Sequence, residues 1–244
     1  MEGYKVELPR YCQADSISTE SVKQLESKKE SVSTQIKNSN VEDKCETVET
    51  NIGEYTVISS NTPYIFVKGK TLDLCYEKDA LERIIVSDDF KIINSAFCMC
   101  KNLKEVIVSE GITDLRQMAF ASCPSLERIV LPNTLESIGK QAFSNCTSLK
   151  EIIIPDSVKK IGIEAFIWCK SLKEIRIPNS VTEIGSKAFE GCEKLQTVYL
   201  PSSISKITGK CRFLPENINF YVEKNSIAED YVKKNYKNAS INYI

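Results

Sequence analysis

The chain reads LKEIIIPDSVKKIGIEAFIWCKS from Leu149 to Ser171, and this stretch is one complete unit of a repeated pattern. Cysteines recur every 23 residues through the middle of the chain, and so do phenylalanines and leucines. The three series are Cys100, Cys123, Cys146, Cys169 and Cys192; Phe120, Phe143, Phe166 and Phe189; and Leu103, Leu126, Leu149, Leu172 and Leu195. A constant period of roughly 20–50 residues is typical of solenoid proteins.

Each part of the unit has a physical interpretation. LKEIII is a β-branched run whose first, fourth and sixth residues we expect to point inward. Pro155 cannot donate to a sheet, so it ends the strand and turns the chain. Gly162 is expected to allow a second turn. The spacing of Ala165, Phe166 and Cys169 suits one turn of helix packed against the core.

No single unit can bury its own apolar side chains, so the units are expected to stack. We therefore predict an α/β solenoid, capped at both ends, with one parallel β-sheet and about six 23-residue repeats. Its strands should lie side by side at the usual spacing and be joined by right-handed crossovers. They are expected to begin near Leu81, Leu103, Leu126, Leu149, Leu172 and Leu195.

The run L-x-x-I-x-I-P-x-x-V-x-x-I-G-x-x-A-F-x-x-C resembles the BspA-like leucine-rich repeat, also called the Treponema-pallidum-type repeat. The resemblance covers about residues 81–223. It implies a curved solenoid used in protein binding and adhesion, often at the surface of bacteria or anaerobic protozoa, and it implies no catalytic residues. The first unit lacks the Pro and Gly, and the sixth lacks the Ala-Phe pair, as expected where a solenoid ends.

The flanks of the repeats differ in composition, and four parts are predicted. Residues 1–52 form a polar N-terminal arm, helical or disordered, in which a short apolar seam could instead be a partner-binding helix. Residues 53–80 contain strands that cap the first repeat, and residues 81–216 form the leucine-rich repeat solenoid. Residues 217–244 form a C-terminal cap. In this cap we expect a strand at Phe220–Val222, a helix opened by a capping box of Ser226 and Glu229, and a last strand at SINYI.

Composition excludes several classes of function. The chain of 244 residues has 32 Lys+Arg, 33 Asp+Glu and no His, which gives a formal net charge of -1. With no bulk positive charge, nucleic acid is a poor candidate partner. Without His, neither a Ser-His-Asp nor a Cys-His catalytic set can form, and imidazole metal sites are excluded. No cofactor and no metal are expected.

The N-terminus and hydropathy bear on localisation. The first residues lack the apolar run of a signal peptide, and no stretch is long and apolar enough for a membrane span. The expectation is a cytoplasmic protein, or a cell-surface or secreted protein if the given N-terminus is not the native one. The cysteine column could bind metal or form disulfides, but its regular spacing after Ala-Phe favours buried, reduced thiols that pack in the core.

Side chains that point outward from the strands are the candidate binding residues. Charges in this face alternate in sign, as in Lys150-Glu151, and should largely neutralise one another across strands. An apolar column follows the sheet and ends in polar and aromatic residues: Ile85, Ile107, Val130, Ile153, Arg176, Tyr199 and Tyr221. Such a column can stiffen the sheet or bind a partner, and Arg and Tyr are typical anchor residues. Trp168 stands at a variable position and is either an ordinary exposed aromatic or a further contact.

The function predicted from these observations is non-catalytic protein recognition on the exposed face of the sheet. The alternative is a cell-surface adhesin-like protein that binds a host or matrix component, with the N-terminal arm as a tether. An enzyme would need a convergent catalytic set, and the sequence shows none. Partner identity and oligomeric state are not encoded in any recognisable motif.

Overall fold

The computed structural model describes residues 45–50, 53–58, 65–67 and 81–244, apart from positions 87, 89, 212, 213 and 216. The chain from Lys44 to Ile244 belongs to one compact unit. The predicted helical or disordered arm at residues 1–44 and the predicted strand at residues 70–74 lie outside the described residues. The repeat region is a parallel-sheet solenoid, which confirms the predicted fold class.

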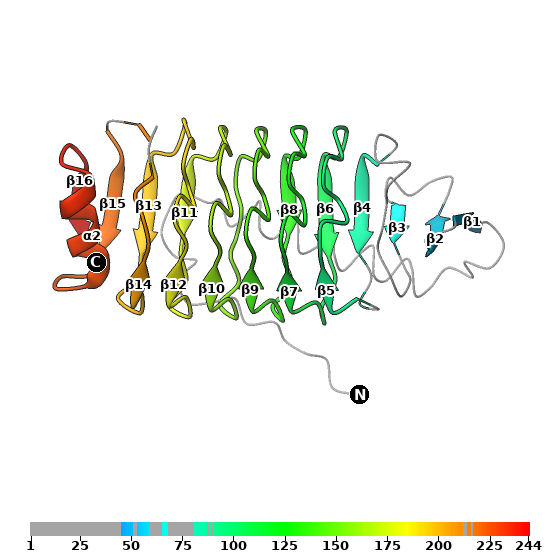
Figure 1. The fold of residues 1–244 in the computed structure, drawn as a ribbon, viewed down its shortest axis with the longest axis horizontal. Coiled ribbons are helices and arrows are strands. Elements are labelled where there is room, and N and C mark those ends of the chain that lie inside the picture. Colours follow the sequence, from blue (N-terminus) through cyan, green and yellow to red (C-terminus); the bar gives the residue numbers. More distant parts are fainter. Residues whose placement is uncertain are drawn as a thin grey trace. The chain divides into compact units, whose positions relative to one another are not determined.

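The wide sheet of the solenoid is built from the LxxIxI runs, stacked in register (Figure 1). Residues such as Ile84 and Val106 face each other across neighbouring repeats and are fully buried. Because side chains alternate along a strand, every second residue of each run points into the core. The strands of this type are β4 (Arg83–Val86), β6 (Glu105–Val108), β8 (Arg128–Val130), β11 (Glu174–Arg176) and β13 (Thr197–Leu200).

The sheet is interrupted at one repeat, which corrects the expectation of six consecutive strands. The run at residues 149–154 forms no strand, so β8 and β11 belong to separate sheets. Its inward side chains Ile152 and Ile154 are nevertheless buried. The same β-branched run occurs in the neighbouring repeats, so local propensity does not explain the break. Ladders elsewhere in the repeat continue through this point and keep the repeat in place.

A second, narrow parallel sheet runs along another side of the solenoid, in addition to the one sheet that was predicted. Its strands have two residues each, and the second is a buried Ile or Leu in all but the last. Strands this short show no alternation, so the period-2 pattern could not reveal them. They are β5 (Ile92–Ile93), β7 (Asp114–Leu115), β9 (Ser137–Ile138), β10 (Lys160–Ile161), β12 (Glu183–Ile184) and β14 (Lys206–Ile207).

The segment around each Ala-Phe pair is a series of turns and not the predicted turn of helix. In the third repeat the N–H groups of Gln141, Phe143 and Asn145 donate to carbonyls of the next repeat, at 2.9, 2.8 and 2.7 Å. Gln141 and Asn145 adopt left-handed conformations, with φ of 56° and 60°. These two residues turn alternate amides toward the neighbouring repeat. The backbone therefore forms its hydrogen bonds between repeats and not within a helix.

The glycines of the third, fourth and fifth repeats, Gly139, Gly162 and Gly185, allow close stacking, whereas the sequence suggested a turn. Gly162 is not among the residues with positive φ. A Cβ on Gly162 would lie 2.5 Å from the carbonyl carbon of Gly139 and 2.7 Å from the amide nitrogen of Lys140. Backbones of successive repeats therefore approach too closely here for any side chain.

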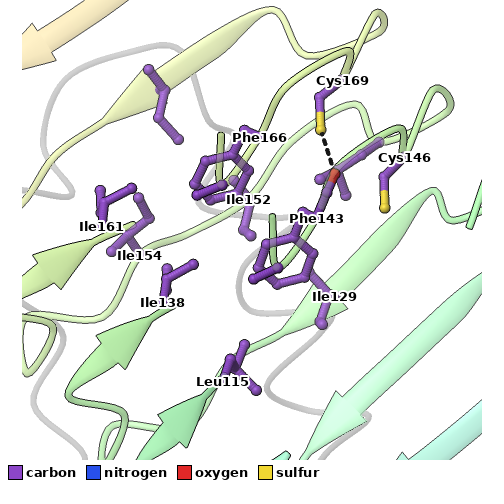
Figure 2. Packing of buried hydrophobic residues seen from close by; sticks show 14 of the residues in the cluster. Leu115, Ile129, Ile138, Phe143, Cys146, Ile152, Ile154, Ile161, Phe166 and Cys169 are labelled. Carbon is purple, nitrogen blue, oxygen red and sulfur yellow. Dashed lines mark hydrogen bonds between the residues drawn. The ribbon is translucent and has the colours of Figure 1, made fainter. Parts of the chain in front are cut away.

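The core consists of side-chain columns that run along the solenoid. Phe97, Phe120, Phe143, Phe166 and Phe189 stack with ring centroids 5.1–5.7 Å apart. Figure 2 shows two of these rings among the isoleucines of both sheets. Neighbouring rings are within 9° of parallel, so the five rings form one continuous stack.

Strands precede the first repeat and extend its sheet. β3 (Ile65–Val67) pairs in parallel with β4, and β2 (Gly53–Ile58) pairs antiparallel with β3. Two strands are thus present within residues 53–80, where capping strands were expected. β1 (Cys45–Thr50) forms an antiparallel hairpin with β2. This strand corrects the expectation that the polar arm is helical or disordered as far as residue 52.

The last part of the chain contains the expected strand, helix and strand. β15 (Asn219–Val222) and β16 (Ser240–Tyr243) continue the sheet after β13, and α2 (Ile227–Asn235) lies between them in the chain (Figure 1). Ser226 caps α2 by accepting from the N–H of Glu229 at 3.1 Å. The Glu229 carboxylate accepts from Lys233, Tyr243 and the Asn225 N–H, and these donors lower its pKa to about 2.

Candidate protein-binding face

The sheet brings three of the predicted site residues into one stack. Arg176, Tyr199 and Tyr221 occupy the same position in β11, β13 and β15. The guanidinium carbon of Arg176 lies 3.6 Å from the centroid of the Tyr199 ring. The Tyr199 and Tyr221 rings stack with centroids 4.5 Å apart and an 18° angle between planes. Parallel register places equivalent positions of neighbouring strands side by side, and it thereby forms a stack of Arg176, Tyr199 and Tyr221.

The apolar part of the predicted stripe is only partly accessible. Ile153 is 41% exposed and Val130 is half-buried. Ile85 and Ile107 are 6% and 3% exposed. These two residues are therefore buried and not on the surface, where they were expected. The accessible surface runs from Val130 through Ile153 to Tyr221, and we call these five residues, Val130, Ile153, Arg176, Tyr199 and Tyr221, the outer face.

The charges beside this face pair along the solenoid axis, as the alternating signs suggested. The Lys104 ammonium lies 3.0 Å from Glu82, and the Lys150 ammonium lies 2.7 Å from Glu127. The hydrogen bond from the lysine lowers the pKa of Glu82 and of Glu127. Exposed pairs of this kind contribute little to the free energy of unfolding, so they set the local charge pattern more than the stability.

Trp168 lies apart from the outer face. It belongs to the turn between β10 and β11, and its N–H donates to the Glu190 carbonyl of the next repeat at 2.7 Å. Its ring packs on Gly191, where a Cβ would collide with the indole, and the Lys170 ammonium lies 5.7 Å from the ring centroid. Trp168 is half-buried and has φ of 60°. The structure therefore gives it a packing role and does not bring it to the predicted stripe.

Six copies of the BspA type leucine rich repeat region match the chain, over residues 72–166 and 145–242. The chain belongs to this family. Similar solved structures include a leucine rich repeat protein of T. pallidum, TpLRR, with 25% identity and a TM-score of 0.51. The match covers 78% of this chain and 95% of that protein.

A second similar structure is the pneumococcal vaccine antigen PcpA, with 26% identity and a TM-score of 0.52. This match covers 66% of the chain but only 40% of PcpA. No curated protein matches the chain significantly. The family assignment therefore rests on the repeats themselves, and they account for the columns of Leu, Phe and Cys.

The described part of this BspA-type protein has neither a metal-binding cluster nor a membrane helix. No three or more Cys, Asp or Glu side chains are grouped so that they could hold a metal ion there. Among the same residues, no helix has both the length and the apolar character needed to cross a membrane. What the geometry offers is a rigid surface with aromatic and cationic groups.

The cysteine column of the BspA-type repeats is buried and reduced, and each thiol is bonded to the preceding repeat. The thiols of Cys123, Cys146, Cys169 and Cys192 point to the carbonyls of Phe97, Phe120, Phe143 and Phe166 at 3.0–3.3 Å. Figure 2 shows this hydrogen bond for Cys169. All four are free cysteines. Each thiol thus packs in the core and adds a hydrogen bond to a carbonyl of the preceding repeat. The Phe143 and Phe166 carbonyls also accept from the backbone N–H groups of Cys146 and Cys169.

These four thiols are expected to resist labelling in the native protein. Burial raises the pKa of Cys146 to about 12 and raises the pKa of Cys169 as well, which removes the reactive thiolate. Mass spectrometry after iodoacetamide treatment should find them modified only in urea. The raised pKa also predicts that their contribution to stability is complete below pH 9 and is lost as the pH rises toward 12. Rapid native labelling of the column would contradict this assignment.

Proposed function

We propose that the chain is a non-catalytic recognition scaffold that binds a protein partner on the outer face. The observation that carries the proposal is the preformed stack of Arg176, Tyr199 and Tyr221. Arg and Tyr dominate the energetics of protein interfaces, because they bury a large area and keep a polar tip. Here each ring is held by its neighbour, so little side-chain entropy remains to be lost on binding.

The surroundings of the stack favour a protein partner over a small ligand. Ile153 supplies exposed apolar surface. Glu174 lies 3.6 Å from one nitrogen of the Arg176 guanidinium, and the other N–H groups of this side chain can donate to a partner. The neighbouring lysines and glutamates are paired, so they would orient a partner more than attract it. The family is composed of repeat scaffolds that are generally protein-binding or surface-associated and typically not enzymes.

The experiment is affinity capture with the purified protein, followed by quantitative binding to the captured partner. The double change Arg176→Ala with Tyr199→Ala should weaken binding about a thousandfold, since two central anchors are worth about 2 kcal/mol or more each and every 1.4 kcal/mol is about tenfold. Its thermal midpoint should fall only modestly, because both side chains are partly exposed. The matched control is Lys159→Ala with Lys160→Ala on the narrow sheet, which should bind normally. If the Arg176/Tyr199 variant binds as tightly as the control, the outer face is not the binding site.

A second candidate is an adhesin-like protein at the cell surface that binds a host or matrix component. It is supported by the 26% identity with PcpA, which is a vaccine antigen. The two candidates differ in location, since the recognition scaffold is proposed to act in the cytoplasm and the adhesin outside the cell. Surface proteolysis and labelling of intact cells that express the native gene would decide between them.

A further inference from the structure

The sixth repeat departs from the pattern just before the C-terminal cap, and a cavity lies there. The sequence has Cys211 and Arg212 where the repeat would place Ala and Phe. A cavity of about 520 Å³ is lined by residues of this segment and by the end of α2 with the loop that follows it. This volume is within the range of small-molecule sites, roughly 300–1,000 Å³.

The lining of the cavity combines cationic and apolar groups. Lys210, Lys234 and Lys237 contribute to it, and none of the described residues that line it is acidic. Leu214 and Pro215 supply an apolar wall. Among the described residues these three lysines have no salt bridge, although many lysines of the repeats pair with a glutamate. The described lining therefore carries three positive charges beside an apolar surface.

Helix capping accounts for little of this charge. The C-terminal carbonyls of α2 are bonded by other groups, since the Asn235 amide donates to the Tyr231 carbonyl at 2.8 Å and the Tyr236 N–H donates to the Val232 carbonyl at 2.8 Å. Lys234 can also complement the helix dipole. Lys210 and Lys237 lie outside the helix, so this explanation does not extend to them.

The wall around Tyr236 is preorganised. The Tyr236 hydroxyl accepts from the Cys211 N–H at 3.1 Å and lies 3.2 Å from the Tyr231 hydroxyl. The Lys210 ammonium lies 5.8 Å from the centroid of the Tyr236 ring, which places one cationic group at the cavity. A fixed aromatic wall with cations at its border suits a flat, negatively charged ligand.

We propose that this cavity binds a small organic anion, with a carboxylate, sulfonate or phosphate group held by Lys210, Lys234 and Lys237 and an apolar body against Leu214, Pro215 and Tyr236. This site is independent of the outer face, so either proposal can fail without the other. The charge attracts the anionic group, and the apolar wall selects ligands that carry hydrophobic surface.

The test uses 8-anilinonaphthalene-1-sulfonate as the probe and its uncharged relative N-phenyl-1-naphthylamine as the comparison. The sulfonate should bind at one saturable site, be displaced by 1-naphthoate and bind more weakly as ionic strength rises. The change Lys210→Gln with Lys237→Gln should weaken the binding of the sulfonate about tenfold. Lys101→Gln with Lys194→Gln removes the same charge elsewhere and should have no effect.

The proposal is overturned if the sulfonate does not bind, if the uncharged probe binds equally well, or if both double variants behave alike. Thermal melting of each variant checks its folding. Because the lysines are exposed, their replacement should leave the melting temperature unchanged. If the first double variant melts early, Lys234→Gln alone replaces it. That variant should bind the sulfonate about threefold more weakly, and unchanged affinity would again overturn the proposal.

Discussion

Gly162→Ala should destabilise the protein by about 3 kcal/mol or more, although it adds a single methyl group. The new Cβ would meet the backbone of Gly139 and Lys140 at 2.5–2.7 Å. Backbone atoms cannot rotate away as the end of a side chain can, so the two repeats must separate. That separation would also strain the narrow sheet, in which Lys160 and Ile161 pair with Ser137 and Ile138. Urea unfolding followed by circular dichroism measures the loss.

Gly111→Ala is the matched control, since it is the same substitution with a different physical consequence. Gly111 has φ of +96°, and a Cβ there would come no closer than 3.5 Å to its nearest neighbour, the Lys91 ammonium. The cost is then limited to backbone strain, about 1–2 kcal/mol. A Gly162→Ala protein as stable as Gly111→Ala would show that repeats can move apart freely at this position.

Phe143→Ala should cost about 3–5 kcal/mol, because it removes a fully buried ring from the middle of the stack. The ring contacts Phe120 and Phe166 at centroid distances of 5.7 and 5.3 Å, so both neighbours lose a partner. The methyl group of alanine leaves a cavity that a stacked, hydrogen-bonded backbone cannot close. Equilibrium denaturation with fluorescence of Trp168 as a local probe gives the change in stability.

Phe189→Ala provides the comparison within the same column. Phe189 is 7% exposed, and among the described residues it stacks only on Phe166. Its removal should therefore cost clearly less than that of Phe143. Equal losses at the two positions would mean that the stack contributes through burial alone and that interaction between rings adds nothing.

The stripe shows how far the candidate site could be predicted. Period-2 alternation correctly placed Arg176, Tyr199 and Tyr221 at one position of the sheet, since parallel strands in register carry like positions side by side. Alternation gives the direction of a side chain but not what covers it, so the burial of Ile85 and Ile107 was not foreseen. The cavity at the C-terminal cap had one sequence signal, the loss of the Ala-Phe pair in the sixth repeat.

Trp168 shows a different limit. Its column contains Met99, Ser122, Asn145 and Gly191, and this variability suggested partial exposure, in agreement with the half-buried side chain. The common property of the column is a left-handed backbone, with φ from 56° to 72°. Asn and Gly tolerate that conformation, which is a signal that sequence reasoning could have used. The contact between Trp168 and Gly191 depends on neighbouring repeats and required the structure.

The sequence alone determined the solenoid, its period, the buried columns of Leu, Phe and Cys, and the strand, helix and strand of the C-terminal part. These features follow from local periodicity, because identical units that cannot bury their own apolar faces must stack. Only the tertiary structure decided the narrow second sheet, the break at residues 149–154, the role of Gly162 and the geometry of the Arg176–Tyr199–Tyr221 stack. The physical reason is that each depends on the distance between repeats, a quantity set by backbone contacts across 22 or 23 residues of chain.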